Sequence, residues 1–231
     1  MIKLRGNKIT WILAGSILLL NVALFIWSMV AGEAIIAPIY FRFGFVPAIF
    51  LAAPFAPFSL LSLVTYFFLH GGWLHMGLNA AMLLALGTGV ERNLGAKWLV
   101  LTLIISSLFA LLLHLVLYPQ SAIPVIGASG GISGLLAVVL VTMMGQNNPK
   151  KIATLIALFI AISFVFGMLG GPNGENIAWV AHIGGFAGGL VVAFILYRLQ
   201  HRGGHRRSSQ KQNHAQASGV VLPFRKPDPD A

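Results

Sequence analysis

The feature that most constrains this chain is a series of uncharged apolar stretches at or near the length that crosses a bilayer. A helix needs about 20 apolar residues to span the hydrocarbon core. We predict six such spans, at residues 11–30, 73–90, 98–118, 129–144, 152–169 and 177–197. Only 9% of the residues are charged, against roughly 25% in a soluble domain. The sequence therefore predicts an all-α integral membrane protein and excludes a cytoplasmic globular domain.

The stretch at 11–30 follows Lys3, Arg5 and Lys8 and so resembles a signal peptide. It is longer than the usual core of about 7–15 residues, and no small-residue cleavage site leads into a polar mature start. We predict an uncleaved membrane anchor.

Positive charge predicts the orientation of the spans, because Lys and Arg gather in cytoplasmic connections. Of the 15 Lys and Arg residues, Arg42 alone falls on the opposite side from the rest when six spans are drawn. This distribution explains the net charge of +10 without nucleic-acid binding. We expect a cytoplasmic N-terminus at 1–10, a membrane domain at 11–199, and a disordered basic cytoplasmic tail at 200–231 that could touch anionic lipid.

Two segments are unusual for a simple bundle. Residues 31–69 fall outside the membrane yet are mostly apolar and interrupted by prolines, which predicts an interfacial outer loop; a loop that merely packs on the bundle is the alternative. The span at 129–144 is short for a bilayer, at about 24 Å against about 30 Å. Irregular backbone at that depth must line a cavity or be buried in protein, so we expect a sunken polar cavity near Ser129.

Few polar side chains fall within or beside the spans, and such residues are candidates for function. His75 and Asn79 are four residues apart and share one helix face. His70 lies about 140° from His75 around an ideal helix, and no cysteine is present, so we predict no metal site. The full set is His70, His75, Asn79, His114, Ser129, Ser133 and His182, with Glu91 near a helix end.

Ser129 stands among small residues, in Gly127-Ala128-Ser129-Gly130-Gly131, at a predicted helix start. A helix N-terminus offers free N–H groups that can stabilise an oxyanion. In the last span, Gly185 and Gly189 form a small-xxx-small pattern that lets a neighbouring helix approach closely. That approach could deliver His182 to a partner. Helix packing remains the alternative interpretation of both patterns.

Taken together, four motifs resemble the rhomboid intramembrane serine proteases, over about residues 60–195. They are His70-x-x-x-x-His75-x-x-x-Asn79, then Gly89-Val90-Glu91-Arg92-x-Leu94-Gly95, then Gly127-Ala128-Ser129-Gly130, and finally Ala181-His182-x-x-Gly185-x-x-x-Gly189. Each motif is weak alone, but their order and spacing are specific.

The resemblance implies a six-helix rhomboid bundle of the bacterial type that hydrolyses peptide bonds in or near transmembrane segments, with no cofactor and no metal. Ser129 would be the nucleophile and His182 its base. His75, Asn79 and the Ser129 N–H would form the oxyanion hole. The supporting residues would be His70, Gly127, Gly130, Gly185, Gly189 and Glu91, the last holding the inner end of the second helix.

One residue departs from the family pattern, and it bears on the choice of nucleophile. Ser133 occupies a position that is often aromatic in the family. There the aromatic side chain would pack on the histidine base. Ser133 also shares a helix face with Ser129 and is a minor rival nucleophile.

Two other classes of function compete with the protease. A transporter built on buried histidines would be expected to carry carboxylates within the membrane; the acidic residues here fall in loops or at a helix end. Loss of Ser129 or His182 would indicate a catalytically silent relative that binds membrane clients; both residues are present, but Ser133 in place of an aromatic residue keeps this alternative open. For the protease we expect transmembrane protein substrates, a plasma (inner) membrane location with both termini cytoplasmic, and a site that opens to the outer face.

Overall fold

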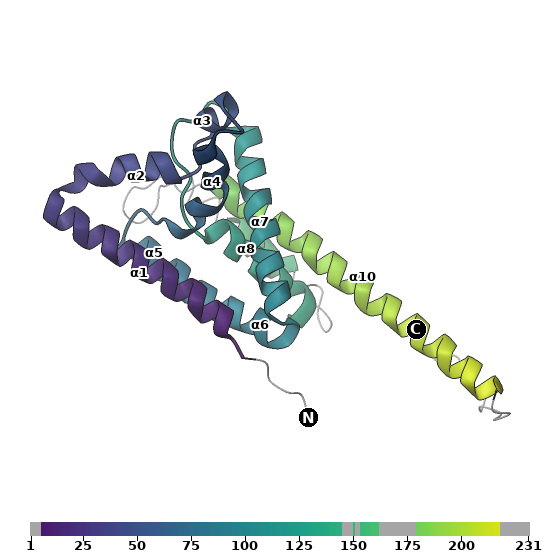
Figure 1. Cartoon of the computed structure of the whole chain (residues 1–231). Helices are drawn as coiled ribbons and strands as arrows, with labels where there is room; N and C mark the ends of the chain where they lie inside the picture. Colours follow the sequence, from purple (N-terminus) through teal and green to yellow (C-terminus); the bar gives the residue numbers. More distant parts are fainter. Residues whose placement is uncertain (1–5, 145–149, 151–152, 162–178, 218–231) are drawn as a thin grey trace. The chain divides into compact units, whose positions relative to one another are not determined.

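A computed structural model describes residues 6–144, 150, 153–161 and 179–217 of the chain. Within these residues the regular structure is helical, apart from one isolated bridge between Phe45 and Val125 (Figure 1). The main helices are α1 (Lys8–Ala31), α5 (Trp73–Met82), α6 (Thr88–Leu94), α7 (Ala96–Leu117), α8 (Ser129–Val139) and α10 (Trp179–Ala217). Short helices η1 (Glu33–Ile35), α2 (Ile36–Phe43), α3 (Pro47–Ala52), α4 (Pro57–Thr65) and η2 (Tyr66–Phe68) join α1 to α5. Two π-helical segments are η3 (Leu83–Gly87), between α5 and α6, and η4 (Leu140–Met144), after α8.

Four helical stretches are long and apolar enough to cross a membrane: Lys8–Ala31, Trp73–Leu94, Ala96–Leu117 and Trp179–Leu199. They coincide with the first, second, third and sixth predicted spans. The fourth corresponds to the shorter apolar helix Ser129–Thr142. Residues 153–161 are helical, but the rest of the fifth predicted span, 152–169, lies outside the described residues. The prediction of an all-α, multi-pass membrane protein is confirmed.

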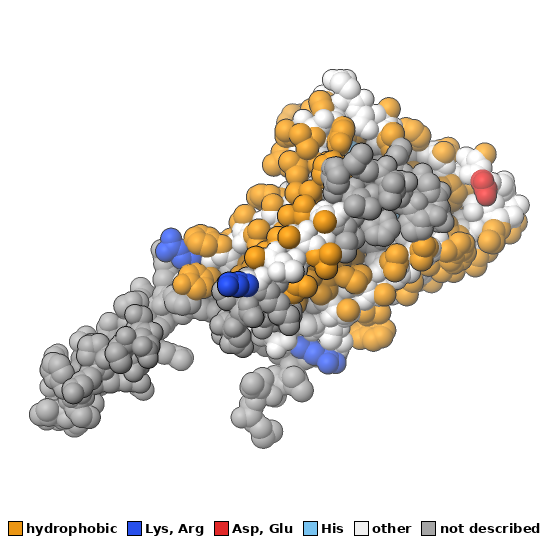
Figure 2. All heavy atoms as spheres, turned by 180° about the vertical axis from the view of Figure 1, so that it is seen from behind, with side chains coloured by type: hydrophobic (Ala, Val, Ile, Leu, Met, Phe, Trp, Pro, Cys, Tyr) orange, Lys and Arg blue, Asp and Glu red, His pale blue; other side chains and the backbone are white. Residues whose placement is uncertain are grey.

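The described surface is strongly apolar. Phe55 is 86% exposed, Val30 83% and Leu19 76%, and Figure 2 shows hydrophobic side chains spread over most of the described atoms on one face. Exposed apolar area on this scale is unfavourable in water and is explained by contact with lipid.

The chain divides into two compact units, Met1–Ala193 and Phe194–Ala231. In the first unit α7 packs on α8 and α6, and α5 packs on α1. Helices α2, α3 and α4 gather at the end of this unit that lies away from α6 (Figure 1). Pro47 and Pro57 each begin a helix, as expected for a residue that lacks an N–H, so the segment 31–69 folds as short helices. Its interfacial position stays a prediction.

In the second unit, the structure differs from the expected disordered tail. Helix α10 continues to Ala217, whereas the composition of the chain predicted an irregular segment from residue 200. Residues 200–217 contain no proline and include four Gln and three Arg, which tolerate helix well. The remaining part of the predicted tail, 218–231, lies outside the described residues.

Glu91 on α6 binds the start of α1. Its carboxylate accepts hydrogen bonds from the N–H groups of Ile9, at 3.1 Å, and Thr10, at 2.8 Å, and from the Thr10 hydroxyl at 2.6 Å. These two amides belong to the first turn of α1, where N–H groups have no partner within the helix. The carboxylate also opposes the positive end of the helix dipole. Glu91 thus joins α1 to α6 at the end of the unit where both helices carry basic residues.

We expect Glu91→Gln to lower the free energy of unfolding by about 1.5–3 kcal/mol, the usual worth of hydrogen bonds to a charged group. Thermal unfolding in mild detergent measures the loss. Glu33→Gln is the control, because Glu33 is exposed. Equal unfolding of both variants and the wild type would contradict the role of Glu91.

Candidate active site

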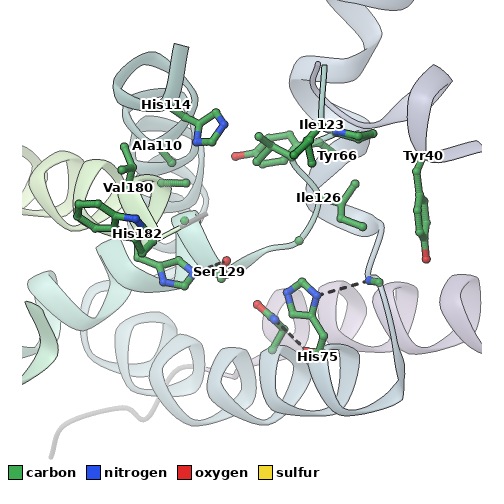
Figure 3. A pocket seen from close by; sticks show the side chains of 18 of the residues that line it. Tyr40, Tyr66, His75, Ala110, His114, Ile123, Ile126, Ser129, Val180 and His182 are labelled. Atoms are coloured by element: carbon green, nitrogen blue, oxygen red, sulfur yellow. Dashed lines mark hydrogen bonds between the residues drawn. The ribbon is translucent and has the colours of Figure 1, made fainter. Parts of the chain in front are cut away.

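A cavity of about 720 Å³ opens within the first unit (Figure 3). It lies among the start of α5, the end of α7, the connection from α7 to α8, and the first turns of α8 and α10. Most of its wall is apolar, which is typical of ligand-binding cavities. Its polar lining residues include Tyr40, Tyr66, His75, Asn79, His114, Ser121, Ser129 and His182.

Ser129 and His182 meet at this cavity. Ser129 is the first residue of α8, and His182 lies in the first turn of α10. The Nε2 atom of His182 is 2.9 Å from the Ser129 hydroxyl, as Figure 3 shows. The two residues are 53 positions apart in sequence, so the packing of α10 on α8 brings them together.

Glycines make that packing possible. A Cβ on Gly185 would overlap the backbone of Gly130, and one on Gly189 would overlap the backbone of Gly134. The backbones of α8 and α10 therefore touch directly, as the small-xxx-small pattern predicted. On its other side Gly130 faces Ala110 of α7, whose Cβ would lie 2.6 Å from an added Cβ. Three helices thus converge next to Ser129.

Ser133 is turned to a different partner. Its hydroxyl donates to the Ser129 carbonyl at 2.8 Å, and its side chain is buried. A serine bonded to the preceding turn in this way satisfies its own helix backbone. Within the described residues it is Ser129, and not Ser133, that contacts His182.

His75 and Asn79 both line the cavity from α5, on the one face that their spacing predicted. Gly71 N–H donates to Nδ1 of His75 at 3.5 Å, and Nε2 of His75 lies against Gly127. The Asn79 amide donates one hydrogen bond to the His75 carbonyl at 2.9 Å, and its NH₂ group has a second donor.

Gly127 occupies a conformation that other residues rarely adopt. Its φ is +114°, and an added Cβ would lie 2.9 Å from Nε2 of His75. Both the backbone angle and the close approach require glycine. The turn before Ser129 can therefore pass directly beside the His75 ring.

His70 lies behind the cavity and does not line it. The side chain is fully buried, its Nε2 accepts from the Ala128 N–H at 3.4 Å, and its ring centroid is 5.0 Å from that of His75. Burial, aided by the neighbouring His75, lowers the pKa of His70 to about 3, so this imidazole is neutral at pH 7. Within the described residues no three His, Asp or Glu side chains gather in a way that could hold a metal ion.

Two residues near the site, Asn21 and Tyr40, were not predicted from the sequence. Asn21 is fully buried in α1 and bonds to the backbone of Phe68 and His70. Tyr40 on α2 donates to the His70 carbonyl. The position of Asn21 in the middle of the apolar span 11–30 could have indicated a structural role, because an unpaired amide is costly in a membrane. Tyr40 carries no comparable signal.

Comparison with known proteins shows the family to which the chain is similar. Residues 57–199 match the Rhomboid domain family. RHOMBOID-like protein 4 of Arabidopsis thaliana is 36% identical over 140 residues, which are 58% of this chain and 34% of that protein. The Rhomboid-type serine protease 2 of Emericella nidulans is 31% identical over 181 residues, covering 75% of this chain and 34% of that protein.

A third relative has a length closer to that of this chain. The putative rhomboid protease YdcA of Bacillus subtilis is 30% identical over 146 residues, which are 61% of this chain and 69% of that protein. The chain therefore spans about a third of the Arabidopsis and Emericella relatives and about two thirds of the Bacillus one. With the family match extending over more than half of its residues, including all of those that surround the cavity from α5 onward, the chain belongs to the rhomboid family.

Proposed function

We propose that this protein is an intramembrane serine endopeptidase with a Ser129–His182 dyad, acting on peptide bonds in or near the transmembrane segments of membrane proteins. The observation that carries the proposal is the 2.9 Å contact between His182 Nε2 and the Ser129 hydroxyl at a cavity. Serine needs an adjacent base to become a nucleophile, and neutral imidazole suits that task near pH 7.

In the proposed reaction, Ser129 Oγ attacks the substrate carbonyl carbon while His182 Nε2 accepts the hydroxyl proton. The tetrahedral intermediate collapses when the C–N bond breaks, and His182 returns the proton to the leaving amine. Water then attacks the acyl-enzyme ester with His182 again as base, and Ser129 regains its proton as the carboxylic acid leaves. No cofactor or metal is required for this sequence.

The developing oxyanion needs donors that are already in place. The Ser129 N–H lies in the first turn of α8, where amides have no partner within the helix. His75 Nδ1 accepts from Gly71 N–H, so the proton of a neutral His75 resides on Nε2, which lies against Gly127. The second donor of the Asn79 amide completes the proposed oxyanion hole. A substrate helix must unwind to present its carbonyl, which favours substrates with small or helix-weakening residues near the cleaved bond.

The same geometry supports an outward-facing site. Glu91 binds the start of α1, so Lys8, Arg92 and Lys97 lie at one end of the first unit. His75 and Asn79 belong to the opposite part of the Trp73–Leu94 span. Because basic residues mark the cytoplasmic side, we place the termini in the cytoplasm, the cavity toward the outer face, and the protein in a plasma (inner) membrane.

Labelling with a fluorescent fluorophosphonate tests the nucleophile without any knowledge of the substrate. We expect wild type and Ser133→Ala to be labelled in mild detergent and Ser129→Ala to remain unlabelled, because the probe reacts with an activated serine. Ser133→Ala is a matched control, one helical turn away. Unlabelled wild type beside a working serine protease would overturn the proposal and point to a silent relative that binds membrane clients. Labelling that is lost only in Ser133→Ala would show that Ser133, and not Ser129, is the nucleophile.

A further inference from the structure

We propose that Asn21 on α1 and Tyr40 on α2 are positioning residues that set the oxyanion hole through His70. This inference rests on the proposed function and adds two residues outside the four motifs. Asn21 bonds to the backbone of Phe68 and His70, and Tyr40 bonds to the His70 carbonyl.

Asn21 uses its amide to bind α1 to the segment before α5. Its Nδ2 donates to the Ile17 carbonyl and to the Phe68 carbonyl, both at 2.7 Å, and its Oδ1 accepts from the His70 N–H at 2.8 Å. The side chain is fully buried. The bond to Ile17 satisfies its own helix, but the other two fix the path of the backbone from Phe68 to His70.

Tyr40 holds the same residue from the other side. Its hydroxyl donates to the His70 carbonyl at 2.6 Å. The backbone N–H and C=O of His70 are thus held by side chains from two different helices, α1 and α2. These two bonds fix the backbone of His70, and because the side chain is fully buried it has little room to rotate.

His70 and the residue after it contact both sides of the proposed oxyanion hole. Its Nε2 accepts the Ala128 N–H, while the preceding amide, Gly127 N–H, donates to the Tyr66 carbonyl at 2.8 Å. With these two amides engaged, the Ser129 N–H is the next donor along the turn, and its direction depends on how the two peptides are held. On the other side, Gly71, the residue after His70, binds the ring of His75.

Preorganised donors stabilise a transition state only when they point at the developing charge, and a misplacement of about 1 Å can cost about 100-fold in rate. Loss of Asn21 or Tyr40 leaves the dyad contact in place but frees the turn that carries the oxyanion donors. The chemical step should then slow, while ground-state binding of the substrate should change little.

The test compares Tyr40→Phe and Asn21→Leu with two controls matched in chemistry. Thr65→Val removes a 2.6 Å hydroxyl bond to the Phe43 carbonyl, and Asn93→Leu removes an amide bond to the carbonyl four residues earlier, at 2.8 Å. Neither control bond involves His70. Tyr40→Phe removes a single oxygen and is the variant least able to disturb folding.

We expect kcat for a cleaved transmembrane substrate, and the fluorophosphonate labelling rate, to fall about tenfold in Tyr40→Phe and more in Asn21→Leu. KM should stay within about twofold, as expected when a transition-state interaction is lost, and both controls should match the wild type. Wild-type kcat in Tyr40→Phe and Asn21→Leu, or a loss confined to KM or to unfolding temperature, would overturn the inference.

Hydrogen exchange provides a readout that is independent of activity. Amides in the peptide around Ala128 should exchange faster in Tyr40→Phe and Asn21→Leu than in the controls. Unchanged exchange there would reject the positioning role even if the protein proved to be a silent relative. Absence of wild-type labelling, with faster exchange at Ala128, would instead reject the proposed function and keep the structural link.

Discussion

Replacement of His182 by alanine is expected to lower the cleavage rate and the fluorophosphonate labelling rate by about 1,000-fold or more, with the bundle still folded. His182 is the residue whose Nε2 contacts the Ser129 hydroxyl, and a general base contributes about 10²–10⁴-fold on its own. In a dyad the same group both activates the nucleophile and protonates the leaving amine, so its removal affects both steps. The rates are measured with purified protein in mild detergent, alongside thermal unfolding.

Adding free imidazole to His182→Ala tests whether the missing side chain acts as the base. The truncated side chain of His182→Ala leaves space beside Ser129, so added imidazole should restore part of the labelling rate. It should restore none in Ser129→Ala, which lacks the nucleophile. Wild-type activity should also fall as the pH decreases, because a protonated imidazole cannot accept the hydroxyl proton. Full labelling of His182→Ala without imidazole would show that another group acts as the base.

The roles of the predicted site residues came from the resemblance to the rhomboid motifs, whereas local spacing alone predicted which residues share a helix face and where helices approach closely. The spacing of His75 and Asn79 places both on one face of α5, and both line the cavity. The glycines after His182 predicted a close helix contact, and Gly185 and Gly189 lie against the backbone of α8. In each case a short repeat with helical period carries the information.

Contacts between distant segments could not be predicted in this way. Asn21 binds residues 47 and 49 positions away. Tyr40 lies in a segment interrupted by prolines, so the direction of its backbone could not be predicted. Hydropathy alone also gives no indication of the π-helical segment η3 between Asn79 and Glu91. Such a segment places an extra residue in its turn. Residues of α5 and α6 that a period of 3.6 residues would place on one helix face therefore lie on different faces.

Gly185→Ala is expected to lower the free energy of unfolding by about 3 kcal/mol or more and to abolish labelling of Ser129. An added Cβ would overlap the Gly130 carbonyl group, which is backbone and cannot move aside as a flexible side chain could. Overpacking of a well-packed interior costs about 1–3 kcal/mol, and a clash with backbone belongs at the upper end. Separation of α10 from α8 would also withdraw His182, one turn away.

Gly77→Ala is the matched control for this variant. It lies within α5, and nothing approaches an added Cβ within 4 Å, so alanine should leave stability unchanged or raise it by up to about 1 kcal/mol through helix propensity. Both variants are compared with the wild type by thermal unfolding and by labelling. Wild-type stability in Gly185→Ala would contradict direct backbone contact between α8 and α10. Normal stability with lost labelling would separate the two consequences, because the helices would then stay packed while His182 moved away from Ser129.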